Sequence, residues 1–116
     1  MYLSQLDFIK HINDEVLFIE QVMIGKTIRD VENDLLLQKA LIRSLEVIGE
    51  ATKKISPELR GKYPQIDWRA MAGTRDKLIH DYFNVDLELI FDITQTYLPT
   101  LKSNINFILK NESEIS

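Results

Sequence analysis

The sequence predicts an all-α protein, an antiparallel bundle of four to five helices, and three observations support this prediction. Apolar residues recur at alternating spacings of three and four along most of the chain, which is the period of one face of an α-helix. Capping residues precede these stretches, and Gly or Pro interrupts them, whereas no stretch reads as a strand. The connections are short, so successive helices are expected to pack as antiparallel neighbours.

The first two helices have the clearest apolar stripes. A helix is expected from Ser4 to Ile24, with its apolar face at Ile9, Ile12, Val16, Ile19 and Met23, and Gly25 closes it. A second helix is expected from a cap at Asn33 to about Lys54. Its predicted buried stripe is Leu37, Leu41, Leu45, Ile48 and Ile55.

Shorter helices are expected in the second half. Ser56-Pro57-Glu58 is typical of a cap and first turn, and Gly61 and Pro64 then break the chain. Asp67 is expected to cap a helix from Trp68 to about Tyr82, and Asp86, after a short joint at residues 83–85, to cap another that runs to Leu98. Pro99 either kinks this helix or starts a fifth through Leu101, Ile105, Ile108 and Leu109. The tail from Asn111 to Ser116 is expected to fray.

Length and composition favour a single helical domain over residues 1–116. The chain has 116 residues, of which 45% are hydrophobic. This length and composition suffice for one hydrophobic core, but the chain is too short for two domains. It has no cysteine, so disulfides and thiol ligands are excluded, which fits a reducing cytoplasm. Neither a signal peptide nor an apolar run of the roughly 20 residues that span a bilayer is present, so a cytoplasmic protein without membrane contact is expected.

The charge distribution allows a local contact with a polyanion. The net charge is −4, which disfavours a protein that grips nucleic acid over its whole surface. From Lys53 to Lys77, however, the sequence has seven basic and three acidic residues. This segment therefore has a net charge of +4, and the rest of the chain has a net charge of −8. Ordinary solvated helix faces are an equally open explanation.

The segment from Arg75 to Tyr82 holds the residues best suited to chemistry. It spells R-x4-H-x-Y, with Arg75, His80 and Tyr82 in the three fixed positions. Arginine is a permanent cation that suits phosphate, and histidine exchanges protons near neutral pH, so the pair suggests phosphodiester chemistry without a metal. Five residues rotate a helix direction by about 140°, so Arg75 and His80 do not share one face of a straight helix. Either the helix loosens, or the arginine reaches round, or a symmetric dimer gathers residues of two protomers.

Each of these residues also has a purely structural explanation. His80 follows Asp76 by four residues and forms an ordinary helical pair with it, and Tyr82 suits a packing position. Asp7/His11 and Asp76/His80 are D-x3-H pairs, but two ligands do not fill a coordination shell, so no metal and no cofactor are expected.

The second predicted helix adds a polar side with two explanations. Arg43, Glu46 and Glu50 share this side. They either form a solvated face with one internal salt bridge, or a carboxylate among them orients the side chain of Arg75 or His80 without contacting the substrate. Gly49 is expected to let another helix approach closely, and Phe18 lies on the side of the first helix away from the core.

Three stretches together resemble the HepT-like toxin group of the HEPN nuclease superfamily. They are Arg43-Ser-Leu-Glu46-Val-Ile-Gly49-Glu50-Ala51, Tyr63-Pro64-Gln-Ile-Asp-Trp68 and Arg75-Asp-Lys-Leu-Ile-His80-Asp-Tyr82-Phe83, in the family's order. The resemblance extends from the first helix to the Leu98-Pro99 pair and implies a metal-independent endoribonuclease that acts as the toxin of a toxin–antitoxin module. It also implies a homodimer with Arg75 and His80 at the dimer cleft. The implied antitoxin is a minimal nucleotidyltransferase that transfers AMP from ATP onto Tyr82.

Two other functions remain open at this point. The chain is either a HEPN-type bundle without cleavage activity that serves as the dimerising partner of a nucleotidyltransferase, or a structural helical bundle without a nucleic-acid role. The presence of both Arg75 and His80 favours the ribonuclease, whereas the acidic net charge favours the structural bundle.

Overall fold

The computed structural model describes residues 4–73 and 85–115, and it confirms the all-helical prediction for this part of the chain. Its elements are α1 (Gln5–Met23), α2 (Ile28–Glu32), α3 (Leu35–Lys53), α4 (Pro57–Lys62), α5 (Trp68–Ala72), α7 (Leu87–Asp92), the π-helical turn η1 (Ile93–Tyr97) and α8 (Leu98–Ile115). The expected continuation of α5 to Tyr82, and the joint that follows as far as residue 84, lie outside the described residues. No described helix is long and apolar enough to cross a bilayer.

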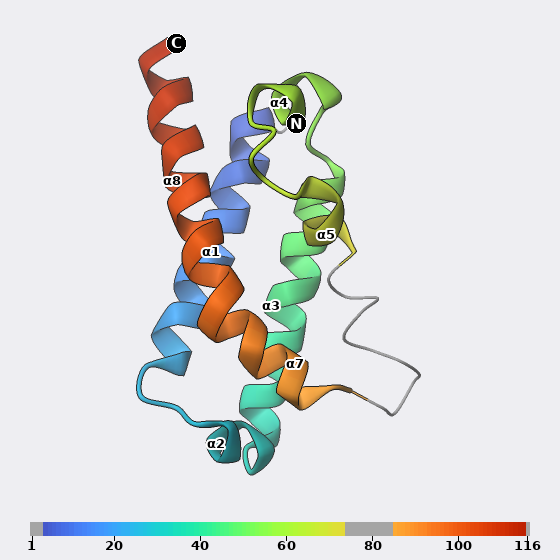
Figure 1. Ribbon diagram of the computed structural model, residues 1–116, viewed down its shortest axis with the longest axis vertical. Helices are drawn as coiled ribbons and strands as arrows, with labels where there is room; N and C mark the ends of the chain where they lie inside the picture. The colour runs from blue at the N-terminus through green and yellow to red at the C-terminus, as the bar shows by residue number, and fades with distance from the viewer. Residues whose placement is uncertain (1–3, 74–84, 116) are drawn as a thin grey trace.

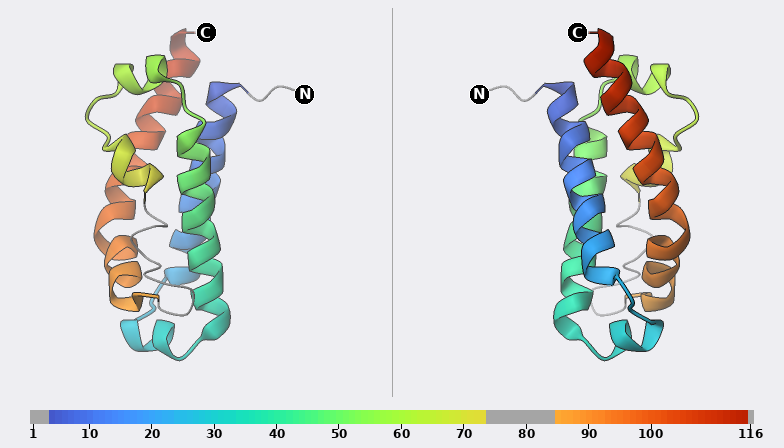
Figure 2. Two further views of the ribbon diagram at one scale, coloured as in Figure 1. Left: turned by 90° about the vertical axis from the view of Figure 1, so that its right-hand side faces the viewer. Right: turned by 90° about the vertical axis from the view of Figure 1, so that its left-hand side faces the viewer.

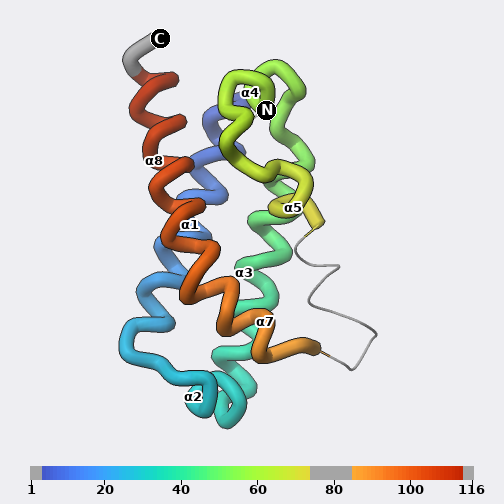
Figure 3. Tube along the Cα trace, viewed as in Figure 1, coloured from blue at the N-terminus to red at the C-terminus, as the bar shows by residue number. Residues whose placement is uncertain are grey.

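The helices form two layers. The long helices α1 and α3 run antiparallel side by side in one layer, while α7, η1 and α8 follow one another as a single rod in the other (Figures 1 and 2). Helix α1 packs against both α3 and α8, which joins the layers. The short helix α2 closes one end of the molecule between α1 and α3, and α4 lies at the other end near the N-terminus of α1 (Figure 3).

The core consists of the apolar stripes that the spacing predicts. Helix α1 buries its five predicted residues, and the five predicted for the second helix are buried as well. Leu101, Ile105 and Ile108 of α8 complete the core between the layers. The spacing of the apolar residues was sufficient to predict which side chains are buried, because each long helix has one unbroken apolar face.

The connection between α1 and α3 differs from the prediction. Thr27 and Asp30 form a capping box in which the Thr27 N–H donates to Asp30 at 2.7 Å, and this box starts the unpredicted helix α2. Asn33 therefore ends α2, with its N–H donating to the Arg29 carbonyl, and was wrongly expected to cap α3. The cap of α3 is Asp34, whose carboxylate accepts from the Leu37 N–H at 3.0 Å.

Pro99 is accommodated by a π-helical turn without a break in the rod. Proline has no N–H, so the carbonyl four residues earlier loses its usual donor. The chain widens into η1 just before Pro99, and the Leu98 N–H reaches back five residues to the Ile93 carbonyl. The hydroxyls of Thr94 and Thr96 donate to the carbonyls of Phe91 and Asp92, at 2.7 and 2.8 Å.

The tail of the chain is helical and is held by the hydroxyl of Tyr63, whereas the sequence predicted a frayed end. Helix α8 continues to Ile115, and the buried Tyr63 hydroxyl donates to the Glu112 carboxylate at 2.6 Å. The Asn111 side-chain amide donates to the same hydroxyl at 2.7 Å. Burial raises the pKa of Tyr63, and the Glu112 carboxylate adds to this shift, so the hydroxyl keeps its proton and remains a donor at neutral pH. Two side chains of the tail thus bind one residue 48 or 49 positions earlier, a contact that helical spacing does not reveal.

Replacing Tyr63 with phenylalanine should loosen the end of α8. The change leaves the ring for packing but removes the hydroxyl, so the free energy of unfolding should fall by about 1–2 kcal/mol, as for a lost buried hydrogen bond. Urea denaturation measures this loss. The Glu112→Gln variant keeps an acceptor for Tyr63 and should lose less. Equal stability of Tyr63→Phe and the wild type would contradict the anchoring role.

Candidate functional site

The candidate site lies where the short helix α5 meets the C-terminal part of α3, at Gly49. Asp67 caps α5 by accepting from the Ala70 N–H at 3.0 Å. Two buried side chains, Trp68 and Met71, fix the helix to the core, and the Trp68 indole N–H donates to the Tyr63 carbonyl at 3.0 Å. A helix of five residues is held by such contacts rather than by its own propensity.

Gly49 allows the end of α5 to rest directly on α3, which confirms the predicted close approach. A Cβ atom at Gly49 would lie 3.3 Å from the Ala72 carbonyl oxygen and 3.5 Å from that of Met71. These distances leave little room for any side chain. The end of α5 at Ala72 therefore lies against the C-terminal part of α3.

The polar side of α3 carries the three charged residues that the sequence singled out. Arg43 and Glu46 form the predicted ion pair, with 3.7 Å between Nη1 and Oε2. The Arg43 side chain is 66% exposed and that of Glu46 only 23%, so the pair itself stabilises the fold little. Glu50 is exposed one turn further along. Among the three, Glu46 is the shielded carboxylate, on the flank of α3 that leads to Gly49.

The predicted catalytic and modified residues lie outside the described part of the chain. Arg75, Asp76, His80 and Tyr82 all belong to residues 74–84. The described elements on either side of this segment are α5 and α7, and both pack against α3. The two elements that flank these residues in the sequence thus contact the helix that carries Arg43, Glu46 and Glu50.

Tyr97 is a residue near the site that sequence reasoning did not identify. Burial raises the pKa of Tyr97 to about 12, and the negative charge of Asp67, the cap of α5, contributes to the shift. The hydroxyl therefore keeps its proton at physiological pH. Tyr97 lies within the regular helix that was expected from Asp86 to Leu98, whereas the structure places it at the end of the π-helical turn η1.

The structure assigns Asp7 to helix capping. Its carboxylate accepts from the Ser4 N–H at 2.8 Å, and this hydrogen bond is the main reason that the pKa of Asp7 is lowered. His11 is exposed on the same helix. Over residues 4–73 and 85–115, no three His, Asp or Glu side chains gather closely enough to hold a metal ion.

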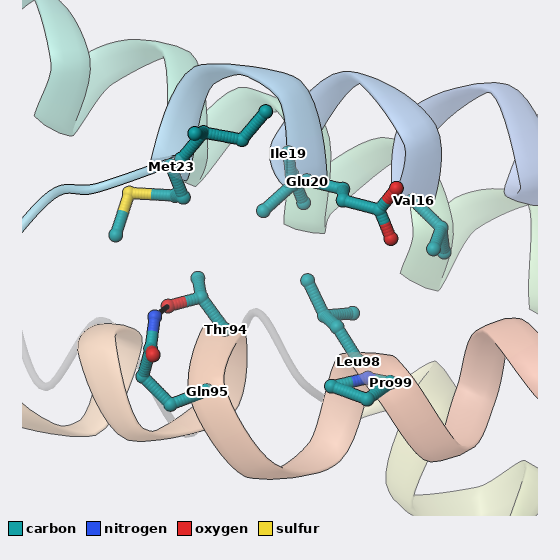
Figure 4. A pocket seen from close by; sticks show the side chains of 9 residues that line it. Val16, Ile19, Glu20, Met23, Thr94, Gln95, Leu98 and Pro99 are labelled. Atoms are coloured by element: carbon teal, nitrogen blue, oxygen red, sulfur yellow. Dashed lines mark hydrogen bonds between the residues drawn. The ribbon is translucent and has the colours of Figure 1, made fainter.

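A small cavity of about 160 Å³ lies apart from the candidate site, between α1 and the η1–α8 rod (Figure 4). Val16, Ile19 and Met23 approach it from α1, while Thr94, Gln95, Leu98 and Pro99 approach it from the rod. Glu20 at its edge is paired with Lys102 at 2.8 Å. The cavity is smaller than the roughly 300 Å³ at which ligand pockets begin, and it holds none of the predicted site residues.

Comparison with known proteins identifies relatives along most of the chain. The family described as "Ribonuclease HepT-like" matches residues 12–108. A protein of Caldanaerobacter subterraneus that is provisionally named an RNase is 37% identical over 105 residues, which cover 90% of this chain and 94% of the relative. The "Probable ribonuclease HepT" of Thermococcus cleftensis is 36% identical over 107 residues, which cover 92% of this chain and 97% of that protein. No solved structure matches.

The contact at Gly49 predicts a large difference between two glycine substitutions. Gly49→Val should lower the free energy of unfolding by about 2 kcal/mol or more, because its side chain would have to displace the α5 backbone. Gly61→Ala is the matched control, since Gly61 is also helical but has nothing within 4 Å of its would-be Cβ. It should stabilise the fold by about 0.5–1 kcal/mol. Similar thermal unfolding of the two variants would mean that α5 does not depend on this contact.

Proposed function

The chain belongs to the ribonuclease HepT-like family, and from this premise we propose that it is a metal-independent endoribonuclease, the toxin of a cytoplasmic toxin–antitoxin module of type VII character. The observation that carries the proposal is the family match over residues 12–108, which includes the R-x4-H-x-Y motif at Arg75, His80 and Tyr82. The packing of α5 and α7, the described elements on either side of the motif, against α3 supports it.

The proposed reaction uses the RNA's own 2′-hydroxyl as the nucleophile. One histidine acts as a base and takes the 2′-hydroxyl proton while that oxygen attacks the neighbouring phosphorus. A second group donates a proton to the departing 5′-oxygen, so the products are a 2′,3′-cyclic phosphate and a free 5′-hydroxyl. One imidazole does not start in both protonation states, so His80 and His80 of the partner subunit share the two roles in a homodimer. Arg75 binds the scissile phosphate and stabilises the charge that develops there.

The charged side chains on the polar side of α3 orient Arg75 and His80 without contacting the RNA. Arg75 follows Ala72 by three residues in the sequence, and the Ala72 carbonyl lies against Gly49 of α3. Glu46, three residues before Gly49, is the shielded carboxylate on this side and is the best placed to orient the arginine. Arg43 and Glu50 form the outer rim, and Asp76 is spaced to orient His80.

The proposed control is a covalent modification of Tyr82. A minimal nucleotidyltransferase antitoxin binds ATP, and the Tyr82 phenolic oxygen attacks the α-phosphorus. AMP becomes attached to the tyrosine, the phenolic proton is lost, and pyrophosphate departs. A phosphate held two residues after His80 would occlude the RNA site and compete for Arg75.

One observation favours the alternative, a non-cleaving HEPN-type partner of a nucleotidyltransferase. Two cations of the predicted basic segment are engaged within the fold. Arg60 donates to the carbonyls of Thr52 and Ile55 at 2.7 and 3.2 Å, and Lys62 pairs with Glu112 at 3.5 Å. Glu112 offsets the charge of Lys62, and the guanidinium of Arg60 is held against the backbone, so fewer cations of this segment are free to contact RNA than the sequence indicates. A cleavage assay separates the two functions.

The purified protein should cleave single-stranded RNA in the presence of EDTA and leave 2′,3′-cyclic phosphate ends. Arg75→Ala and His80→Ala should each lower the rate at least about 10²-fold, the scale for a lost acid–base or charge-stabilising group. Glu46→Gln should lower the rate less, because it affects Arg75 only indirectly. The exposed residues Arg69 and His11 provide matched controls, and their alanine variants should cleave normally. Activity in His80→Ala, or its abolition by EDTA, would point to a different mechanism.

Incubation with the cognate nucleotidyltransferase and ATP should add AMP to the wild type and suppress cleavage. Tyr82→Phe lacks the acceptor oxygen and should cleave RNA yet escape both effects. Intact-mass analysis measures the addition, and Tyr97→Phe, which removes a different tyrosine hydroxyl, should still be modified. Equal AMP addition to Tyr82→Phe and wild type would show that another residue is the acceptor.

A further inference from the structure

Helix α3 carries two lysines whose charges are not used within the fold. Lys53, in its last turn, belongs to the basic segment of the sequence, and Lys39 lies fourteen residues earlier. Both are exposed, and neither forms an ion pair with a residue that the structure describes. Their charges are therefore available to a molecule outside the chain.

The two lysines and Glu46 form one column along α3. Lys39, Glu46 and Lys53 follow one another at spacings of seven residues, so they point in nearly the same direction, with a drift of about 20° per step. Two lysines fourteen residues apart are separated by about 21 Å along the axis, at 1.5 Å per residue. The column thus presents a positive, a negative and a positive charge in turn.

This column lies on the flank of α3 that belongs to the candidate site. On a helical wheel its three side chains point about 40° to 80° away from Gly49, on which α5 rests. The buried Leu45 points about 40° from Gly49 in the opposite sense, towards the core. Lys53 lies one turn beyond the α5 contact, and Lys39 lies towards the N-terminal end of α3, near α7 (Figure 1). The two lysines therefore bracket the part of α3 that carries Glu46.

We propose that Lys39 and Lys53 bind phosphates of the RNA backbone on either side of the cleaved bond, so that the substrate strand lies along α3. The inference deepens the proposed function and rests on it for the identity of the ligand. A lysine is a compact charge on a flexible stem, which suits phosphate contacts that do not depend on base sequence. The Glu46 carboxylate repels phosphate, so the backbone contacts α3 at the two lysines, and the scissile phosphate between them is left to Arg75 of the proposed site.

The neighbours of Lys39 on α3 favour an external anion. No carboxylate lies three or four residues from Lys39, and Arg43, four residues later, has the same charge, which destabilises a helix slightly. A phosphate bound at Lys39 relieves this repulsion. Lys53 interacts favourably with the C-terminal end of the helix dipole, but Lys54 at the same end supplies this effect as well.

The acidic charge of the chain does not cancel these two contacts. Glu46 lies about 10.5 Å along the axis from each lysine, which exceeds the Debye length of about 8 Å at physiological ionic strength. A phosphate at either lysine therefore responds to its nearest neighbours rather than to the net charge of −4. Glu50 precedes Lys53 by only three residues, so Lys53 is expected to be the weaker contact.

The spacing of the lysines sets the length of RNA that uses both. Successive phosphates of a stacked nucleic acid strand are about 3.4 Å apart along its axis. Contacts about 21 Å apart along α3 are therefore about six nucleotides apart, with Glu46 midway between them. A strand of four nucleotides reaches one lysine at a time, whereas a strand of twelve reaches both.

Fluorescence anisotropy with a 2′-O-methyl RNA of twelve nucleotides tests the contacts. This RNA lacks the free 2′-hydroxyl that the proposed reaction requires, so it stays intact. Lys39→Ala and Lys53→Ala should each raise the dissociation constant about 3–10-fold and reduce the salt dependence of binding by about 0.7 in the logarithmic slope. Lys39→Arg and Lys53→Arg keep the charge and should bind like the wild type. Lys54→Ala should also bind normally, because Lys54 shares the helix end with Lys53 but points about 100° away.

Strand length provides a second test, whose result a change in folding would not reproduce. The wild type should bind the twelve-nucleotide strand much more tightly than a four-nucleotide strand of the same chemistry. The double variant Lys39→Ala/Lys53→Ala should lose at least about threefold of this difference, because it lacks the two distant contacts. Circular dichroism should show the same helix content in all variants.

The outcomes distinguish this proposal from the proposed function. Unchanged binding by both Lys39→Ala and Lys53→Ala, or an equal loss in Lys54→Ala, would overturn the backbone contacts. Cleavage of unmodified RNA by the wild type would still support the ribonuclease in that case. A wild type that binds RNA through both lysines but leaves unmodified RNA intact would support the contacts and count against the proposed function.

Discussion

The contact between α5 and Gly49 is the constraint on which the geometry of the candidate site depends. A glycine inside a helix lowers helix stability by about 1 kcal/mol relative to alanine, so a tertiary contact is expected to require it. At Gly49 that contact is the close approach of two backbone carbonyls of α5, for which a side chain would leave little room. Trp68 and Met71 then fix α5 in the core, and the end of α5 rests at Gly49, three residues after Glu46 on α3. A shielded carboxylate near this contact is well suited to hold an arginine, because ion pairs strengthen as water is excluded.

Much of this architecture was predictable because its determinants are local. Caps such as Ser4, Ser56, Asp67 and Asp86 start helices through hydrogen bonds to residues three positions later, and sequence spacing shows such pairs directly. The failures arose where two local signals compete or where the partner is distant. Asn33 and Asp34 are both good caps, and only the unpredicted helix α2 decides between them. The ordered tail depends on Tyr63, which lies far away in the sequence.

The distinction between local and distant determinants also applies to the candidate site. The ion pair of Arg43 and Glu46 and the close approach at Gly49 follow from helical spacing and were predicted. Tyr97 was missed because Pro99 changes the helical register just before it, and a wheel drawn at 3.6 residues per turn no longer applies through η1. The π-helical turn thus has a structural cause in proline and a consequence at the site, since it brings a protonated phenol under the influence of the Asp67 charge.

Two sides of helix α3 differ in burial, and the helix is also the support of the candidate site. One stripe buries Leu37, Leu41, Leu45 and Ile48 within the subunit, and the other, one position earlier in register, leaves Leu36 exposed and Ala40 and Val47 half-buried. Helix α3 serves as the scaffold of the candidate site, because α5 and α7, the described elements on either side of residues 74–84, both pack against it. The acidic net charge is compatible with this arrangement, since a catalytic cleft needs positive charge only where the phosphate binds, and two copies of Arg75 supply it there.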